Sequence, residues 1–390
     1  MATACSTLVS AKRHRPIGLE RKAFWMRIGI PREIKIKESR VALLPTQVKQ
    51  LCAAGHDVLV EHNAGALAGA FDEDYVAAGA RIAPDGPALY ARAQMIVKVK
   101  EILRPEFALL RPNHTIIANL YCERDRVMLD RFLDVGLTAI AAEKAHPHKA
   151  GNSPLAGEIA ALEGLRLVLL PYGGTGRHFM RHAGVMSTRV IVIGLGLAGR
   201  GALRTLFGLG VSVVGLDHTQ GTLARAALDW ENRDFTAAHI DTLAEHLPQA
   251  DLVINCVRWD KDRTDHLLTR KMLATMRKGA VIVDVACDRA GAIETSMPTS
   301  WENPTYQVAG VTHFCVENLP SAVPEASSVS FADLIYTLVE PVADLGLARA
   351  VEDQDWLGAA VVCHAGKVVH ERTARLQNMP STPLAEALVV

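Results

Sequence analysis

The segment Val190–Ala202 constrains the fold of this chain more strongly than any other segment. An unbroken β-branched run, Val190–Ile193, leads directly into Gly194, Gly196 and Gly199. A buried strand followed by a glycine-rich turn and a helix is typical of a parallel, doubly wound α/β sheet. We therefore predict that the second half of the chain is an α/β domain built around this turn.

The spacing of these glycines also predicts a ligand. Gly194 permits the tight turn, and Gly196 has no Cβ, so a pyrophosphate can approach the backbone. Gly199 and Ala202 allow the helix to pack closely on the strand. Free N–H groups at the helix N-terminus then face the phosphates. The turn predicts a bound dinucleotide; the alternative is another adenosine ligand such as S-adenosylmethionine.

Asp217 indicates which dinucleotide the turn binds. It lies 18 residues beyond Gly199, at the end of the predicted strand Val211–Leu216. A carboxylate at this position accepts hydrogen bonds from both ribose hydroxyls, whereas a 2′-phosphate there meets like charge. We therefore predict that the cofactor is NAD rather than NADP.

Strands and helices alternate along both halves of the chain, which predicts parallel sheets covered on both faces. The predicted strands are Met26–Ile30, Asp57–Glu61, Gln94–Lys100, Thr115–Leu120, Thr138–Ala142, Val190–Ile193, Val211–Leu216, Leu252–Cys256, Val281–Val285 and Val311–Val316. A helix with one apolar face, Ser328–Leu345, is predicted to follow the second series of strands and to return to the first domain. The expected fold is α/β, with a nucleotide domain (156–324) inserted into a discontinuous substrate domain (26–155 plus 325–390).

Composition excludes several classes of partner. The 42 basic residues balance the 42 acidic ones, which gives no reason to expect nucleic acid or an anionic membrane surface. No apolar run reaches the ~20 residues that span a bilayer. The 7 cysteines are scattered singly and lack metal-ligand spacing, so we predict no metal and a reduced, cytoplasmic compartment.

Residues 1–25 differ in composition from the rest of the chain. Six basic residues face one acid, Glu20, and the segment has no apolar core of the secretory type. An organelle transit peptide is one interpretation. We favour a disordered basic extension that ends where the periodic sequence begins, at Met26.

Five stretches carry a family resemblance: Arg27–Thr46, Val97–Glu101, the glycine turn, Val281–Ser300 and Val316–Pro324. Together they resemble the family of alanine dehydrogenases, the nicotinamide nucleotide transhydrogenase α subunit, and the saccharopine dehydrogenase and lysine-ketoglutarate reductase branch. The resemblance covers about residues 26 to 375. It implies two Rossmann-like domains with a cleft between them, in agreement with the inserted domain predicted above.

The resemblance assigns roles to single residues. Arg40 falls on the family arginine that binds the substrate carboxylate, which a guanidinium matches with two hydrogen bonds. Lys100 falls on the family substrate lysine, at a strand end where α/β sheets bind ligands. Asp288 falls on the family aspartate near the nicotinamide, where it would move protons to and from water. Asn318 matches a segment that passes the nicotinamide and is expected to contact the cofactor.

One family residue is missing. Alanine dehydrogenases carry a histidine 21 residues after the substrate lysine, and that count from Lys100 reaches Tyr121. A two-residue gap reaches Asn119 instead, and neither residue is histidine. Free tyrosine has a pKa of about 10, against about 6.5 for histidine. We therefore expect Tyr121 to donate a hydrogen bond to the substrate rather than act as a base. His114 is a second candidate that would have to take the place of the histidine in space.

A second departure leaves the substrate open. Ile254–Trp259, Cys287–Glu294 and Leu319–Ser327 look more like the lysine-ketoglutarate reductase branch than like alanine dehydrogenases. The leading hypothesis is an alanine dehydrogenase-like enzyme that interconverts a small L-amino acid with its 2-oxo acid and ammonium. The alternatives are a saccharopine- or opine-type dehydrogenase and a non-catalytic NAD(H)-binding module of transhydrogenase type. The resemblance also implies a homo-oligomer.

Overall fold

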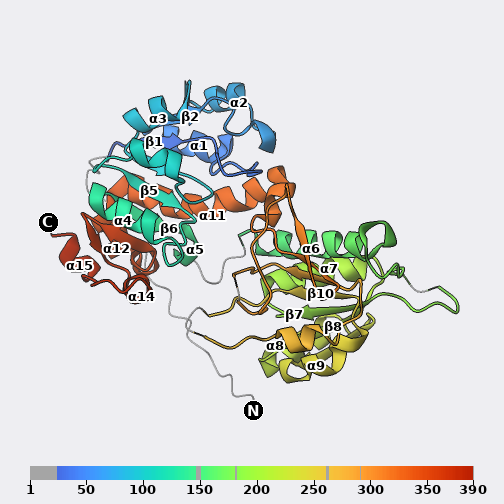
Figure 1. Cartoon of the computed structure of the whole chain (residues 1–390). Helices are drawn as coiled ribbons and strands as arrows, with labels where there is room; N and C mark the ends of the chain where they lie inside the picture. The colour runs from blue at the N-terminus through green and yellow to red at the C-terminus, as the bar shows by residue number, and fades with distance from the viewer. Residues whose placement is uncertain (1–23, 146–150, 181, 261–262, 290, 390) are drawn as a thin grey trace, which may run out of the picture.

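The computed structural model describes residues 24–145, 151–180, 182–260, 263–289 and 291–389 (Figure 1). Residues 1–23, which make up most of the expected basic extension, lie outside the described residues. Within the described ranges, no helix is long and apolar enough to cross a membrane.

Two sheets make up the protein, and the first contains eight strands in the order β15-β14-β6-β5-β4-β1-β2-β3. Its strands are β1 (Arg27–Ile30), β2 (Asp57–Glu61), β3 (Arg81–Ala83), β4 (Met95–Val97), β5 (Thr115–Ala118), β6 (Thr138–Ala141), β14 (Val361–His364) and β15 (Lys367–Val368). The six strands from β1 to β6 are parallel, and β14 pairs antiparallel with β6. Short β-branched or alanine-rich runs suit these strands because helices cover both faces.

Helices pack on the two faces of the first sheet in two separate apolar clusters. One cluster includes buried side chains of α1 (Pro45–Ala53) and α11 (Pro324–Leu345). The other includes those of α3 (Gly86–Arg92) and α4 (Arg126–Val135). Gly136, in the left-handed region at φ 76°, ends α4 and lets the chain turn into β6. Both faces of the sheet are therefore covered by helices, and the ends of the strands are where we expect a ligand to bind.

The second sheet has seven strands in the order β12-β13-β11-β10-β7-β8-β9. They are β7 (Arg189–Ile193), β8 (Ser212–Asp217), β9 (Phe235–His239), β10 (Leu252–Asn255), β11 (Val281–Asp284), β12 (Thr305–Val308) and β13 (Val311–Phe314). Strand order reverses between β7 and β10, the place where doubly wound sheets bind dinucleotides. Helices α6 (Ser153–Val168) and α7 (Leu197–Gly208) pack against each other over one face.

The chain passes between the two sheets twice. Helix α6 leads from the first sheet and packs on β10 and β11 of the second. Helix α11 leads back and packs against α1 and β5, and the predicted helix Ser328–Leu345 lies inside it. Figure 1 shows α11, in orange, running under the first sheet, with the C-terminal segment in red on the same side of the molecule.

Candidate active site

The glycine turn has the geometry that a dinucleotide requires. Gly194 has a φ of 85°, which favours glycine. A Cβ on Gly199 would lie 2.0 Å from the carbonyl oxygen of Gly194, so the helix cannot approach the strand this closely with any larger residue. Gly196 precedes the first turn of α7, and a Cβ placed there would meet nothing within 4 Å. The space in front of the helix N-terminus is therefore open to a phosphate.

Asp217 ends β8 beside this turn. Its Oδ2 accepts a hydrogen bond from the Leu195 N–H at 2.9 Å, and its Oδ1 accepts one from the Thr219 N–H at 2.9 Å. These bonds hold the carboxylate at the turn and also order the turn itself. Because each carboxylate oxygen can accept more than one hydrogen bond, Asp217 can still receive ribose hydroxyls.

Two lysines follow β4, but they differ in their surroundings. The predicted strand Gln94–Lys100 is in fact only Met95–Val97, although the Lys98 N–H still donates to the carbonyl oxygen of Ile117 at 3.0 Å. Lys98 is fully buried, with its Nζ 2.6 Å from Glu106 Oε1 and 3.6 Å from Glu33 Oε2. Burial lowers the pKa of Lys98, but the two carboxylates outweigh burial and the pKa is raised. Lys98 is therefore a charged structural residue.

Lys100 has the opposite electrostatic setting. Burial lowers its pKa, and the nearby cations Lys35 and Arg40 lower it further. Its Nζ lies 5.8 Å from the centre of the Tyr121 ring. Within the described residues, Lys100 forms no ion pair. Its ammonium group can therefore donate to a ligand that also contacts Tyr121.

Arg40 is held in place by a neighbouring acid. Its Nε and Nη2 donate to the two carboxylate oxygens of Glu38, each at 2.6 Å. Both side chains are buried, and the pKa of Glu38 is lowered by Arg40 in spite of its burial. One edge of the guanidinium is thus occupied by Glu38, and the N–H groups of Nη1 remain for a substrate carboxylate.

Tyr121 follows β5 in a left-handed conformation, with a φ of 48°. Glu143, just beyond β6, accepts hydrogen bonds from the N–H groups of Leu120 and Tyr121 at 3.0 Å and 2.8 Å, which holds this strained turn. Burial and the charge of Glu143 raise the pKa of Tyr121 to about 12. The phenol is therefore a hydrogen-bond donor at neutral pH and not a base.

Asp288 lies in the loop that follows β11 of the second sheet, four residues beyond the end of that strand. Its side chain pairs with a residue that follows β5 of the first sheet. Its Oδ2 accepts a hydrogen bond from Arg124 Nη2 at 2.9 Å. The Arg124 guanidinium lies 5.1 Å from the centre of the Tyr121 ring. This ion pair brings the carboxyl ends of the two sheets together.

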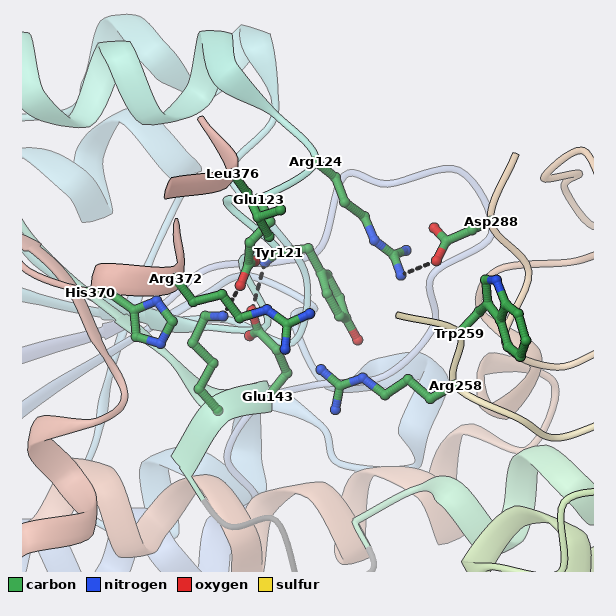
Figure 2. Close-up of a pocket in the computed structure, with 11 residues that line it drawn as sticks. Tyr121, Glu123, Arg124, Glu143, Arg258, Trp259, Asp288, His370, Arg372 and Leu376 are labelled. Carbon is green, nitrogen blue, oxygen red and sulfur yellow. Dashed lines mark hydrogen bonds and ion pairs between the residues drawn. The ribbon is translucent and has the colours of Figure 1, made fainter. Parts of the chain in front are cut away.

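A cavity of about 160 Å³ lies at this junction. It is lined by Tyr121, Glu123, Arg124, Glu143, Lys144, Arg258, Trp259, Asp288, His370, Arg372 and Leu376. Figure 2 shows the Arg124–Asp288 pair on one side of Tyr121 and Arg258 on the other. Of the predicted site residues, Tyr121 and Asp288 line the cavity itself, and Lys100 lies beside Tyr121.

Asn318 lies at the crossing between the sheets rather than in the cavity lining. Its Nδ2 donates to the carbonyl oxygen of Lys37 at 3.4 Å. The neighbouring Glu317 is 3.5 Å from Lys35 Nζ, and Ser39 donates to the carbonyl of Ser321. The loop that carries Arg40 is therefore attached to the segment before α11.

Several cavity residues were not predicted from the sequence. Arg258 lies three residues beyond the end of β10, and strand ends in α/β sheets are the usual ligand positions, so topology could have identified it. Arg372 and His370 come from the C-terminal segment, which no motif connected to the site. His114, the suggested substitute for the family histidine, is buried against Tyr90 and is not among the residues that line the cavity. His370 does line it, but burial and the charge of Lys144 lower its pKa to about 4.

The models of two protein-family domains together match almost the whole chain. The alanine dehydrogenase/PNT N-terminal domain matches residues 29–162, and the C-terminal domain matches residues 160–371. Among curated proteins, the alanine dehydrogenase of Halomonas elongata is 36% identical over 90% of this chain and 96% of its own length. That of Bacillus subtilis is 35% identical over 93% of this chain and 98% of its own length.

Solved structures of members of this family are also similar to the structure of this chain. An L-alanine dehydrogenase superposes with a TM-score of 0.83 at 33% identity, over 90% of this chain and 99% of its own. A transhydrogenase from Sinorhizobium meliloti superposes with a TM-score of 0.71 at 27% identity, over 89% of this chain and 99% of its own.

Proposed function

Because this chain belongs to the alanine dehydrogenase/PNT family, we propose that it is an NAD-dependent dehydrogenase that interconverts a small L-amino acid with its 2-oxo acid and ammonium. In the reductive direction, the 2-oxo acid, ammonium, NADH and a proton give the amino acid, NAD⁺ and water. The observation that supports this proposal best is the cavity between the two sheets, where Tyr121 of one faces Asp288 of the other.

The second sheet would hold the cofactor. NAD(H) supplies the hydride acceptor or donor when it is bound. Gly194, Gly196 and Gly199 leave open space at the N-terminus of α7 for its pyrophosphate. Asp217 would accept the ribose hydroxyls, and Asn318 would approach from the crossing segment.

The first sheet would hold the substrate. We assign the substrate carboxylate to Arg40, whose orientation is set by Glu38. Lys100 would polarise the oxo group, since its buried ammonium has a lowered pKa and thus donates a stronger hydrogen bond. Tyr121 would donate its phenol hydrogen to the same oxygen. A site fixed in this way lowers the barrier by orientation and by stabilising the developing charge.

Asp288 would exchange protons between the substrate and water as the amine replaces the oxo group. Its ion pair with Arg124 holds the carboxylate at the cavity wall. Formation of the amino acid from an oxo acid releases one water, so a group that moves protons beside the cavity is required.

The organisation of the chain is part of the same proposal. The division into a substrate domain (26–155 plus 325–390) and an NAD domain (156–324) is supported by the membership of β1–β6, β14 and β15 in one sheet and β7–β13 in the other. We further propose a cytoplasmic homo-oligomer, in line with the family.

The experiment that tests this function offers the purified protein NADH with pyruvate or 2-oxoglutarate. The amine is ammonium in one series and lysine or ornithine in another. We expect NADH oxidation with ammonium. Oxidation only with a second amino acid would support a secondary-amine dehydrogenase, and NADH binding without turnover would support the non-catalytic module.

A further inference from the structure

The cavity carries more positive charge than a small neutral amino acid requires. Four cationic side chains line it: Arg124, Lys144, Arg258 and Arg372. Three of the four have carboxylate partners, which are Asp288 for Arg124 at 2.9 Å, Glu123 for Lys144, and Asp260 for Arg372 at 2.7 Å. The charges of these three are largely neutralised inside the protein.

Arg258 is different. In the ranges that the structure describes, it forms no ion pair or hydrogen bond with another residue, and its guanidinium points into the cavity toward Tyr121 (Figure 2). An arginine keeps its charge at any working pH. The cavity therefore contains one guanidinium whose planar edge is open to a ligand with two oxygens.

Glu143 and His370 also line the cavity, and within the described residues neither forms an ion pair or a hydrogen bond with Arg258. Glu143 is bound to the backbone N–H groups of Leu120 and Tyr121, and burial raises its pKa. His370 is uncharged at neutral pH, since burial lowers its pKa to about 4. An incoming anion would thus meet a guanidinium that is not already bound to a carboxylate.

The position of Arg258 places it beside both the cofactor turn and the reacting centre. A Cβ on Gly194 would lie 2.8 Å from the Cγ2 atom of Val257, so Arg258 directly follows a residue that touches the glycine turn. Tyr121 separates it in Figure 2 from the Arg124–Asp288 pair. Arg40 and Lys100 follow strands of the other sheet, and we have assigned the first carboxylate of the substrate to Arg40 and its oxo group to Lys100. Arg258 is therefore suited to a second anionic group on the same substrate.

We propose that the substrate is a dicarboxylic 2-oxo acid and its amino acid, and that Arg258 binds the distal carboxylate. This inference rests on the proposed function, since it uses the same cavity and the same balanced reaction with ammonium and NADH. It specifies the amino acid of the proposed function as an acidic one.

A matched pair of substrates tests this inference. 2-Oxoglutarate and 5-methyl-2-oxohexanoate have the same branched shape, but only the first has a distal charge. We expect Arg258→Met to lower the ratio of their kcat/KM values by about 10- to 100-fold, the value of one charge-assisted hydrogen-bonded contact. Arg258→Lys should recover part of the ratio because the charge returns without the planar fork. Arg92→Met, at an exposed position on α3, serves as the control and should leave the ratio unchanged.

A binding measurement keeps this inference separate from the proposed function. The dissociation constant of 2-oxoglutarate from the NADH-loaded protein is measured by calorimetry for the natural chain and for Arg258→Met. A rise of about 10-fold or more supports the inference even if no 2-oxo acid is turned over, a result that would overturn the proposed reaction alone. An unchanged value, or an equal rise in the dissociation constant of NADH, overturns the inference, because Arg258 would then be idle or would serve the cofactor.

Discussion

The two sheets of this protein have the same core order of strands but carry different chemistry at their ends. The first runs β3-β2-β1-β4-β5-β6 and the second runs β9-β8-β7-β10-β11-β13. At the carboxyl ends of the second, glycines expose backbone N–H groups to a ligand. At the carboxyl ends of the first, the corresponding turns carry charged or phenolic side chains, among them Arg40, Lys100 and Tyr121. One topology thus supports two modes of binding, by backbone and by side chain.

The difference has a structural consequence. Backbone N–H groups at a helix N-terminus need no compensating charge. Charged side chains need partners of opposite charge when they are buried at the end of a sheet. The first sheet supplies them: Lys98 is enclosed by Glu33 and Glu106, and Arg40 is paired with Glu38. The substrate side therefore depends on buried ion pairs, and the cofactor side depends on glycine.

The largest expected effect concerns Asp288, which follows a strand of the second sheet but acts through its side chain. Asp288→Asn removes the group that moves protons, so kcat should fall by about 10³-fold. The dissociation constant of NADH, measured by fluorescence titration, should stay within a few-fold because the glycine turn is untouched. Asp241→Asn, at an exposed position, is the control. Loss of NADH binding in Asp288→Asn would show that the carboxylate has a different role.

The next effect tests the dependence of the first sheet on ion pairs. Lys98→Met leaves Glu33 and Glu106 buried without their cation, which should cost about 3 kcal/mol of unfolding free energy at pH 8. Lys49→Met, exposed on α1, should change it by less than about 0.5 kcal/mol. Equal stability of the two variants in urea denaturation would mean that the cluster is dispensable.

The same variant has a pH dependence. Burial raises the pKa of Glu33 to about 7 in the folded chain, above its ordinary value. The stability associated with that raised pKa is present at low pH and is lost as pH rises through about 7. Without Lys98 the pKa rises further, so the loss caused by Lys98→Met should be smaller at pH 6 than at pH 8. A loss independent of pH would point to packing rather than charge.

A smaller effect tests whether the cofactor site of the second sheet uses side-chain charge in addition to the glycine turn. Asp217→Asn keeps an oxygen for the Leu195 N–H but removes the negative charge. The preference for NAD over NADP, taken as the ratio of dissociation constants, should fall by about tenfold, because a 2′-phosphate no longer meets like charge. Equal weakening of both cofactors would count against the ribose contact.

The smallest effect concerns the residue that stands in the place of the family histidine. Tyr121 stays protonated below a pKa of about 12, so it should add no ionisation to the pH profile of kcat/KM in the neutral range. Tyr121→His should add one at or below about pH 6.5, because burial and the neighbouring cations lower the pKa of a histidine there. Tyr121→Phe, which lacks both the donor and the ionisation, is the control. Identical profiles in all three would remove Tyr121 from the reacting site.

Much of the fold could be predicted from local pattern. The run Val190–Ile193, the glycine turn and the strand Asp57–Glu61 are each visible because short-range periodicity and backbone geometry determine them. The strand Met95–Val97 was predicted too long, since the alternating lysines and valines that follow it have the pattern of a strand. Helix α6 and strands β14 and β15 were not predicted, and β14 pairs with β6 more than 200 residues away.

The sequence by itself determined the parallel sheets, the glycine turn and the family, because these depend on neighbours along the chain. Only the tertiary structure decided that Arg124 reaches Asp288, 164 residues away, and that Arg258 faces Tyr121. It also decided that Lys98 is paired with carboxylates in the interior and that Lys100 lies beside Tyr121. The reason is electrostatic: the state of a charge depends on burial and on its partners in space, and spacing along the chain does not specify either.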